Sequence, residues 1–179
     1  MVQRIWISGL VLLALAAGSR ADDKAGNKAA AKDPQPSLER LKKLAGTWVM
    51  ADKDGKPTDK VVSVIKVIAA GSAVQETLFP GQPHEMVSIY YRDGSDLVMT
   101  HYCVLGNQPR MKADPKSPPN QIHFQFAGGT NLDPAKDKHM HEGTLTFVDD
   151  DHIEFCGVAW EGGKPVKSQE CGMKLVRKK

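Results

Sequence analysis

The chain lacks long apolar runs beyond its N-terminus, carries no large excess of charge of one sign, and has only three cysteines in 179 residues. No segment after residue 21 is apolar enough to cross a bilayer. The one apolar run, residues 5–17, is itself too short to span a membrane. It follows Arg4 and precedes the small residues Ser19 and Ala21, as in a signal peptide cleaved before Asp22.

We therefore expect residues 1–21 to be a signal peptide and the protein to be exported, to the periplasm or the extracellular space. An uncleaved membrane anchor is the alternative. No cysteine follows the apolar run, so a lipoprotein anchor is not expected. Once the signal is cleaved, no membrane partner is expected.

The weak net charge argues against a nucleic-acid partner. The formal charge is +3, and Arg4 and Arg20 both lie in the predicted signal peptide, so the remaining chain is nearly neutral. A nucleic-acid-binding protein would carry a clustered basic face. The basic residues of 174–179 are interpreted as a solvated tail.

The few cysteines, Cys103, Cys156 and Cys171, fit an exported protein with one disulfide and one free thiol, or with three free buried thiols. A hairpin at residues 162–163 would place Cys156 and Cys171 on neighbouring strands. Direct pairing of residues 161 and 164 sets Cys156 opposite Gln169, so a shift in pairing is needed to bring the two cysteines together. This pair is nevertheless favoured over any bond to Cys103.

Residues 22–36 contain almost nothing large and apolar, which predicts a disordered linker. The remaining residues, 37–179, are long enough for one domain with a core. Ser37 is a suitable N-cap, and the leucines at 38, 41 and 44 share one helical face. Gly46 is expected to end this short helix.

After the helix the pattern becomes that of strands separated by turn residues, without internal repeats or further helices. The expected strands are 47–51, 61–69, 73–79, 85–92, 97–105, 121–127, 142–148, 152–160 and 166–177. This spacing predicts an all-β fold, and we favour an antiparallel up-and-down barrel of about eight to ten strands over a sandwich, because closure removes free edges. The longer segments 107–120 and 128–138 are interpreted as loops, which either form the rim of a binding mouth at one end of the barrel or are solvated connectors with no role.

The opening Leu41-x-x-Leu44-x-Gly46-x-Trp48 resembles the start of lipocalin or calycin barrels. The resemblance implies that Trp48 closes the bottom of the barrel and packs on a basic residue of the last strand. Arg177 matches that residue best and Lys174 next. Residues 38–177 as a whole, with the stretches 100–111 and 139–141, resemble an uncharacterised family of secreted bacterial calycin-like domains, which implies a fold and leaves the function open.

Alternation along a strand places His101 and Cys103 on one face, and His139 and His141 on one face of a later segment. Together these four residues could bind zinc or copper. Haem binding is a less favoured form of this metal-site hypothesis, because no residue stands out as an axial ligand. The favoured alternative is that His101 is hydrogen-bonded in the barrel wall and the other two histidines lie at a solvent edge.

Asn107, Gln108 and Arg110, with Met111, form a polar, proline-stiffened stretch that we expect near the barrel mouth, where it could bind an anionic group. The alternative is that Arg110 forms an ion pair with an acid such as Glu142.

The leading hypothesis is non-catalytic binding of a small apolar or amphipathic molecule inside the barrel, with no cofactor required. His101, together with Arg110 and the loop at Asn107, is expected near the mouth as part of this ligand site. A metal- or haem-dependent activity is one alternative, and a structural or inhibitory protein with a filled barrel is another. Cys103 could serve as a nucleophile, but no oxyanion hole or orienting acid accompanies it, so no catalytic residue is predicted. The oligomeric state stays open.

Overall fold

The computed structural model describes residues 37–166 and 170–179. The predicted signal peptide, 1–21, and linker, 22–36, lie outside the described residues. The extent predicted for the domain, 37–179, therefore stays a prediction. No helix in the described part of the chain is both long enough and apolar enough to cross a membrane.

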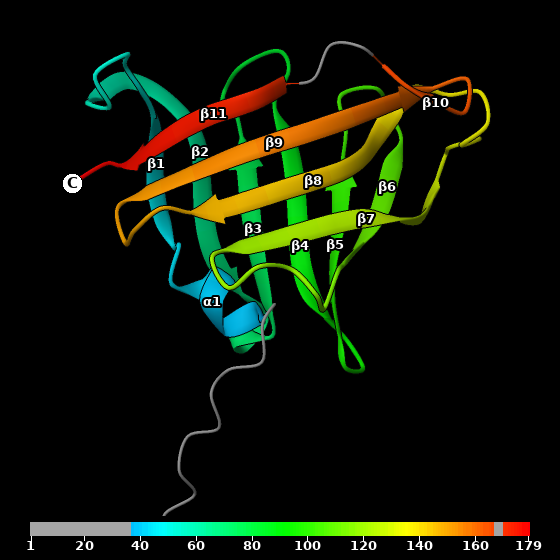
Figure 1. Cartoon of the computed structure of the whole chain (residues 1–179), viewed down its shortest axis with the longest axis horizontal. Coiled ribbons are helices and arrows are strands. Elements are labelled where there is room, and N and C mark those ends of the chain that lie inside the picture. The colour runs from blue at the N-terminus through cyan, green and yellow to red at the C-terminus, as the bar shows by residue number, and fades with distance from the viewer. Residues whose placement is uncertain (1–36, 167–169) are drawn as a thin grey trace, which may run out of the picture. The chain divides into compact units, whose positions relative to one another are not determined.

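Most of the described chain consists of strands that follow one another around a closed ring (Figure 1). The strands are β1 (Gly46–Ala51), β2 (Pro57–Ile68), β3 (Ala73–Leu78), β4 (Met86–Asp93), β5 (Asp96–Tyr102), β6 (Gln108–Ala113), β7 (Gln121–Thr130), β8 (His139–Phe147), β9 (His152–Glu161), β10 (Lys164–Pro165) and β11 (Glu170–Arg177).

The ring closes because β11 pairs with both β1 and β9, and β8 pairs with both β7 and β9. The short β10 pairs with the end of β9 and completes no part of the ring. Neighbouring strands are antiparallel throughout, so the described residues form a ten-strand up-and-down barrel. The expectation of an all-β antiparallel barrel with a short N-terminal helix is confirmed.

The short helix α1 (Leu38–Lys42) lies at one end of the barrel (Figure 1). The side chain of Ser37 caps it by accepting a hydrogen bond from the backbone N–H of Arg40 at 3.2 Å. Leu38, Leu41 and Leu44 are buried in the core, so the apolar face of the helix covers this end. The 3-10 turn η1 (Ala69–Gly71) connects β2 to β3.

Trp48 is fully buried and is the direct β-ladder partner of Arg177. The guanidinium group of Arg177 also donates hydrogen bonds to the backbone carbonyls of Lys43 and Ala45, at 3.0 and 2.8 Å. Gly46 lies in this corner with φ 143°, and a Cβ there would stand 3.0 Å from Arg177 Nη1. The predicted packing of Trp48 on Arg177 is confirmed; Lys174 pairs with Glu154 instead.

Gly46 begins β1 and does not end the helix, whose C-cap is Lys43. One strand and one loop position also differ from the sequence prediction. Residues 108–113 form β6, where a loop was expected. Its connection to β7 lies at the α1 end, because Arg40 donates a hydrogen bond to the carbonyl of Pro119. The loop between β7 and β8 lies at the opposite end, where Asn107 donates to the carbonyl of Lys138 at 2.8 Å. The two segments therefore do not rim the same end.

The cysteines follow the favoured pairing as far as the structure describes them. Cys156 is disulfide-bonded, Cys103 is free, and the Cα atoms of Cys156 and Cys171 are direct partners between β9 and β11. Residue 161 pairs with 164, as assumed from the hairpin, and the shift that the cysteines require falls between residues 165 and 170.

Candidate functional site

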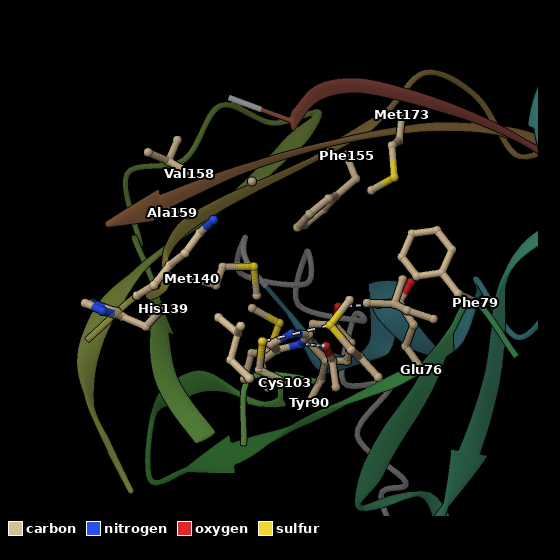
Figure 2. A pocket seen from close by; sticks show the side chains of 18 of the residues that line it. Glu76, Phe79, Tyr90, Cys103, His139, Met140, Phe155, Val158, Ala159 and Met173 are labelled. Carbon is tan, nitrogen blue, oxygen red and sulfur yellow. Dashed lines mark hydrogen bonds between the residues drawn. The ribbon is translucent and has the colours of Figure 1, made fainter. Parts of the chain in front are cut away.

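A cavity of about 190 Å³ lies inside the barrel (Figure 2). Its wall is mostly apolar and includes four methionines, at positions 86, 99, 140 and 173, together with Phe79 and Phe155. Methionine side chains are flexible and polarisable, so such a wall adapts to ligands of different shape. Leu105 and Lys138, which come from the connections at the end remote from α1, also line the cavity.

The floor of the cavity carries a partly buried carboxyl group, that of Glu76 on β3. The hydroxyl of Ser63 donates to its Oε1 at 2.7 Å, and the hydroxyl of Tyr90 donates to its Oε2 at 2.6 Å. Glu76 and Tyr90 also line a gap of about 20 Å³ toward α1, so they separate the cavity from the core beneath. The surface that Glu76 keeps accessible therefore faces the barrel interior.

Burial raises the pKa of the Glu76 carboxyl above its ordinary value, and the two hydroxyl donors oppose that shift. The same burial, with the nearby carboxylate, raises the pKa of Tyr90, so its hydroxyl keeps its proton. No positively charged side chain contributes to the shift at Glu76. The carboxyl group is thus held by hydroxyl groups alone among the described residues.

His101 lies in the cavity wall on β5, directly opposite Ser88 on β4. Its Nδ1 is 2.9 Å from the Ser88 hydroxyl oxygen. Burial lowers the pKa of His101 to about 4. The imidazole is therefore neutral at physiological pH and gives the cavity a hydrogen-bonding group without a positive charge. This agrees with the favoured alternative as far as His101 is concerned; the same alternative placed His139 at a solvent edge, which is wrong because His139 is fully buried.

Two sulfur atoms meet in the wall beside His101. Cys103 follows His101 two residues along the chain, and its Sγ lies 4.0 Å from the Sδ of Met86. Both side chains line the cavity. The free thiol therefore faces the interior next to a thioether and near an imidazole.

The two later histidines belong to an aromatic cluster at the cavity's edge. His139 contributes to the cavity wall, but Figure 2 shows its ring pointing away from the middle of the cavity. Its Nδ1 donates to the carbonyl of Asp137 at 2.8 Å, and its Nε2 is 2.9 Å from Nδ1 of His141. The ring of His141 stacks on that of Trp160, with centroids 3.8 Å apart. Burial, with His139 nearby, lowers the pKa of His141.

The four residues of the metal hypothesis are therefore divided between two environments. Across residues 37–166 and 170–179, no three His, Cys, Asp or Glu side chains are grouped so as to hold a metal ion. His101 and Cys103 face the cavity, whereas His139 and His141 bond to each other beside Trp160.

Of the residues expected to bind a ligand, His101 lies in the cavity wall and the others lie elsewhere. Arg110 points outward from β6 and forms an ion pair with Asp93, not with Glu142, which lies 3.5 Å from His123. Met111 is buried in the core. Strand alternation explains the difference, because Met111 points inward and its neighbour Arg110 must then point outward.

Asn107 and Gln108 hold the rim together. The side chain of Asn107 is buried and its amide nitrogen donates to the Lys138 carbonyl, while its side-chain oxygen Oδ1 has no hydrogen-bond partner. Gln108 accepts hydrogen bonds from Thr130 at 2.7 Å and Asn131 at 3.2 Å. These side chains thus fix the connections around the cavity and do not line it.

Sequence reasoning missed Glu76, although a signal was present. Val74, Glu76 and Leu78 alternate along β3, so the acid lies on the same face as two apolar residues. An acid on the inward face of a strand is unusual, because ionised groups are almost never buried without a partner. Ser63 and Tyr90, its partners, come from β2 and β4, and this pairing is visible only in the folded sheet.

Comparison with known protein families finds no family that matches the chain, and comparison with curated proteins finds no matching relative. The function is therefore argued from the cavity.

Proposed function

We propose that this protein is an exported calycin-like barrel that binds a small, mostly apolar molecule in its cavity. The observation that carries the proposal is the cavity of about 190 Å³ with its largely apolar wall. An engineered apolar cavity of about 150 Å³ is known to hold benzene, so a molecule with one ring is of suitable size. Such a space would not persist if the barrel were a filled structural element.

The assignment to calycin-like barrels is supported by the closed ring, by α1 at one end and by the packing of Trp48 on Arg177. Export is supported by the signal-like pattern of residues 1–21. The disulfide at Cys156 agrees with an oxidising compartment. The uncharged His101 and the largely apolar wall of the cavity favour binding over catalysis.

Calorimetry with toluene tests the proposal. Wild-type protein should bind toluene at one site. Ala159 lines the cavity, so Ala159→Phe should fill it and abolish binding. The matched control is Gln125→Phe, which adds the same ring at an exposed position of β7 and should leave binding unchanged. Failure of the wild type to bind toluene or any probe of similar size, with the fold intact, contradicts the proposal.

A second candidate function rests on the contact between Cys103 Sγ and Met86 Sδ at 4.0 Å. A thiolate and a thioether are the ligands that select a soft ion such as Cu(I), and His101 adjoins them. In this reading the protein would hold Cu(I) in the cavity wall. This set differs from the predicted one, because Met86 takes the place of His139 and His141.

Competition with a chromogenic Cu(I) chelator, under anaerobic conditions, separates the two candidates. The second candidate expects one Cu(I) per chain, lost in Cys103→Ser and in Met86→Leu. If Cu(I) binds in this way and toluene does not, the ion replaces the small molecule as the ligand. If the chelator retains all the Cu(I), the second candidate fails.

A further inference from the structure

Glu76 is the acidic side chain in the wall of the cavity, and its two carboxyl oxygens each accept one hydroxyl hydrogen bond. A carboxylate oxygen has two acceptor sites, so each oxygen keeps one site for a further donor. Ser63 and Tyr90 are almost completely buried and hold the carboxyl group in a fixed orientation. The floor of the cavity is therefore a preorganised acceptor.

The carboxyl group has no positively charged partner to offset its burial. Burial raises the pKa of the Glu76 carboxyl, the two hydroxyl donors only partly oppose that rise, and no cation contributes. Burying an ionised carboxylate in this way is costly unless an opposite charge arrives to pair with it. A ligand that carries a positive charge would supply that partner.

The rest of the cavity agrees with a cationic ligand and disagrees with the anionic one expected from the sequence. Arg110, the guanidinium expected at the mouth, points outward to Asp93. His101 is neutral because burial lowers its pKa to about 4. Lys138 lines the cavity from the connection at the end remote from α1, but it is exposed and makes no contribution to the pKa of Glu76.

We propose that the ligand is a small apolar amine whose ammonium group binds Glu76 while its hydrocarbon part contacts the methionine-rich wall. This inference rests on the proposed function and specifies its ligand class. A volume of about 190 Å³ accommodates one ring with a short aminoalkyl arm. The ammonium would donate to both oxygens of Glu76 from the cavity side, opposite the two hydroxyl groups, and charge-assisted hydrogen bonds of this kind are the strong ones.

The proposal has a direction in pH. The amine requires ionised Glu76, so its binding should weaken as the pH falls through the raised pKa of that carboxyl group. The other titratable groups around the cavity are Tyr90, His101, Cys103, Lys138 and His139. A neutral ligand of the same shape cannot form an ion pair with Glu76. Any pH dependence of its binding therefore measures the contribution of these other groups.

The test is calorimetry on the full chain with three probes of similar size: benzylamine, benzyl alcohol and benzoate. Benzylamine should bind most tightly at pH 8. Glu76→Gln should weaken benzylamine at least about tenfold, which corresponds to ~1.4 kcal/mol, and leave benzyl alcohol within about twofold. Arg110→Ala, on the outer face, is the matched control and should change neither affinity.

The outcomes separate this inference from the proposed function. If benzyl alcohol binds as tightly as benzylamine and Glu76→Gln has no effect, the amine inference fails and the small-molecule function stands. If benzoate binds best and Lys138→Met abolishes that binding, the ligand is an acid held at the rim, which also overturns the inference. If no probe binds, the proposed function fails.

The inference is also testable without substitution of Glu76, in case that variant does not fold. In the wild type, lowering the pH from 8 to 5 should weaken benzylamine and leave benzyl alcohol nearly unchanged. Tyr90→Phe removes one hydroxyl donor and keeps the acid, so the preference for the amine should survive in that variant. Equal pH dependence of the two probes would overturn the inference.

Discussion

The guanidinium carbon of Arg177 lies 4.4 Å from the centroid of the Trp48 ring, at the point where the last and first strands of the barrel meet. Arg177 also donates to the carbonyl of Asp150 in the turn between β8 and β9, at 3.1 Å from Nη2. Trp48 in turn donates from Nε1 to the carbonyl of Leu44 at 2.9 Å. One side-chain pair thus connects the helix end, the ring closure and a distant turn.

Trp48→Ala should lower the free energy of unfolding by on the order of 3 kcal/mol or more, because a large ring is lost from a fully buried position and a cavity remains. Urea unfolding of both proteins, followed by circular dichroism, measures the difference. If the variant is as stable as the wild type, Trp48 does not stabilise the barrel at the junction of β1 and β11.

Arg177→Lys should also destabilise the barrel, by about 1–3 kcal/mol, because an ammonium cannot reproduce the forked hydrogen bonds of the guanidinium or its stacking on Trp48. Lys174→Met is the matched control. Lys174 is exposed and its nearest acid, Glu154, is 3.7 Å away, so its loss should change the stability by less than about 0.5 kcal/mol. Equal effects of the two substitutions would contradict the role of Arg177.

Thiol titration of the denatured, unreduced protein should find one reactive thiol per chain, that of Cys103. Cys103→Ser should show none. Cys156→Ser should show two, because its partner is released, and should lose about 2–4 kcal/mol of stability. Three reactive thiols in the wild type would exclude the disulfide.

His101 should make the protein less stable in acid. Its pKa is about 4 in the folded state, below the ordinary 6.5, so the unfolded chain binds the proton more readily. The free energy of unfolding should therefore fall by roughly 3 kcal/mol between pH 6.5 and pH 4, relative to His101→Gln, which cannot titrate there. Urea unfolding across this range tests it, and parallel curves for the two proteins would exclude the effect.

Glu76 should change the free energy of unfolding with pH in the opposite direction to His101. Its pKa is raised above the ordinary 4.5, so the folded state keeps a proton that the unfolded chain has already released. Stability should fall as the pH rises from 4.5 through the raised pKa. Glu76→Gln lacks this fall, so its stability relative to the wild type should increase toward neutral pH. A difference between the two proteins that is independent of pH would show that Glu76 does not titrate in this way.

The parts of the fold that could be predicted from the sequence are those fixed by neighbours along the chain. Ser37 caps α1 because its side chain needs a donor only three residues away. The hairpin at residues 162–163 follows from two glycines between strand-like runs. The packing of Trp48 on Arg177 is a long-range contact, and it was accessible only because the opening of the chain resembles that of calycin barrels.

The strand β6 was missed because four prolines in residues 107–120 indicate a loop. The sheet accommodates Pro109 beside Gly129 of β7, and the ladder shifts register before Met111. A Cβ at position 129 would lie 2.8 Å from the carbonyl oxygen of Gln108, so only a glycine there lets the two strands approach. Because residues 108–113 were not predicted as a strand, the inward and outward positions along it could not be assigned, and the outward direction of Arg110 was missed.

The candidate site was predictable in part. Alternation along β5 places His101 and Cys103 on the same inward face, which the cavity confirms. The partners of these residues, Ser88 and Met86, come from β4, and their register depends on the β4–β5 turn. The acidic group at the floor of the cavity could not be predicted. The hydroxyl groups that bind Glu76, those of Ser63 and Tyr90, come from neighbouring strands and are brought together only in the folded sheet.

The position of α1 bears on how fast a ligand can exchange. With one end of the barrel covered by the leucines of the helix, a molecule bound as proposed would leave past Leu105 and Lys138 at the other end. There the side chain of Asn107 ties the β5–β6 turn to the carbonyl of Lys138 across the rim. Loss of that hydrogen bond would then be expected to speed release of the proposed ligand from a position that does not itself line the cavity.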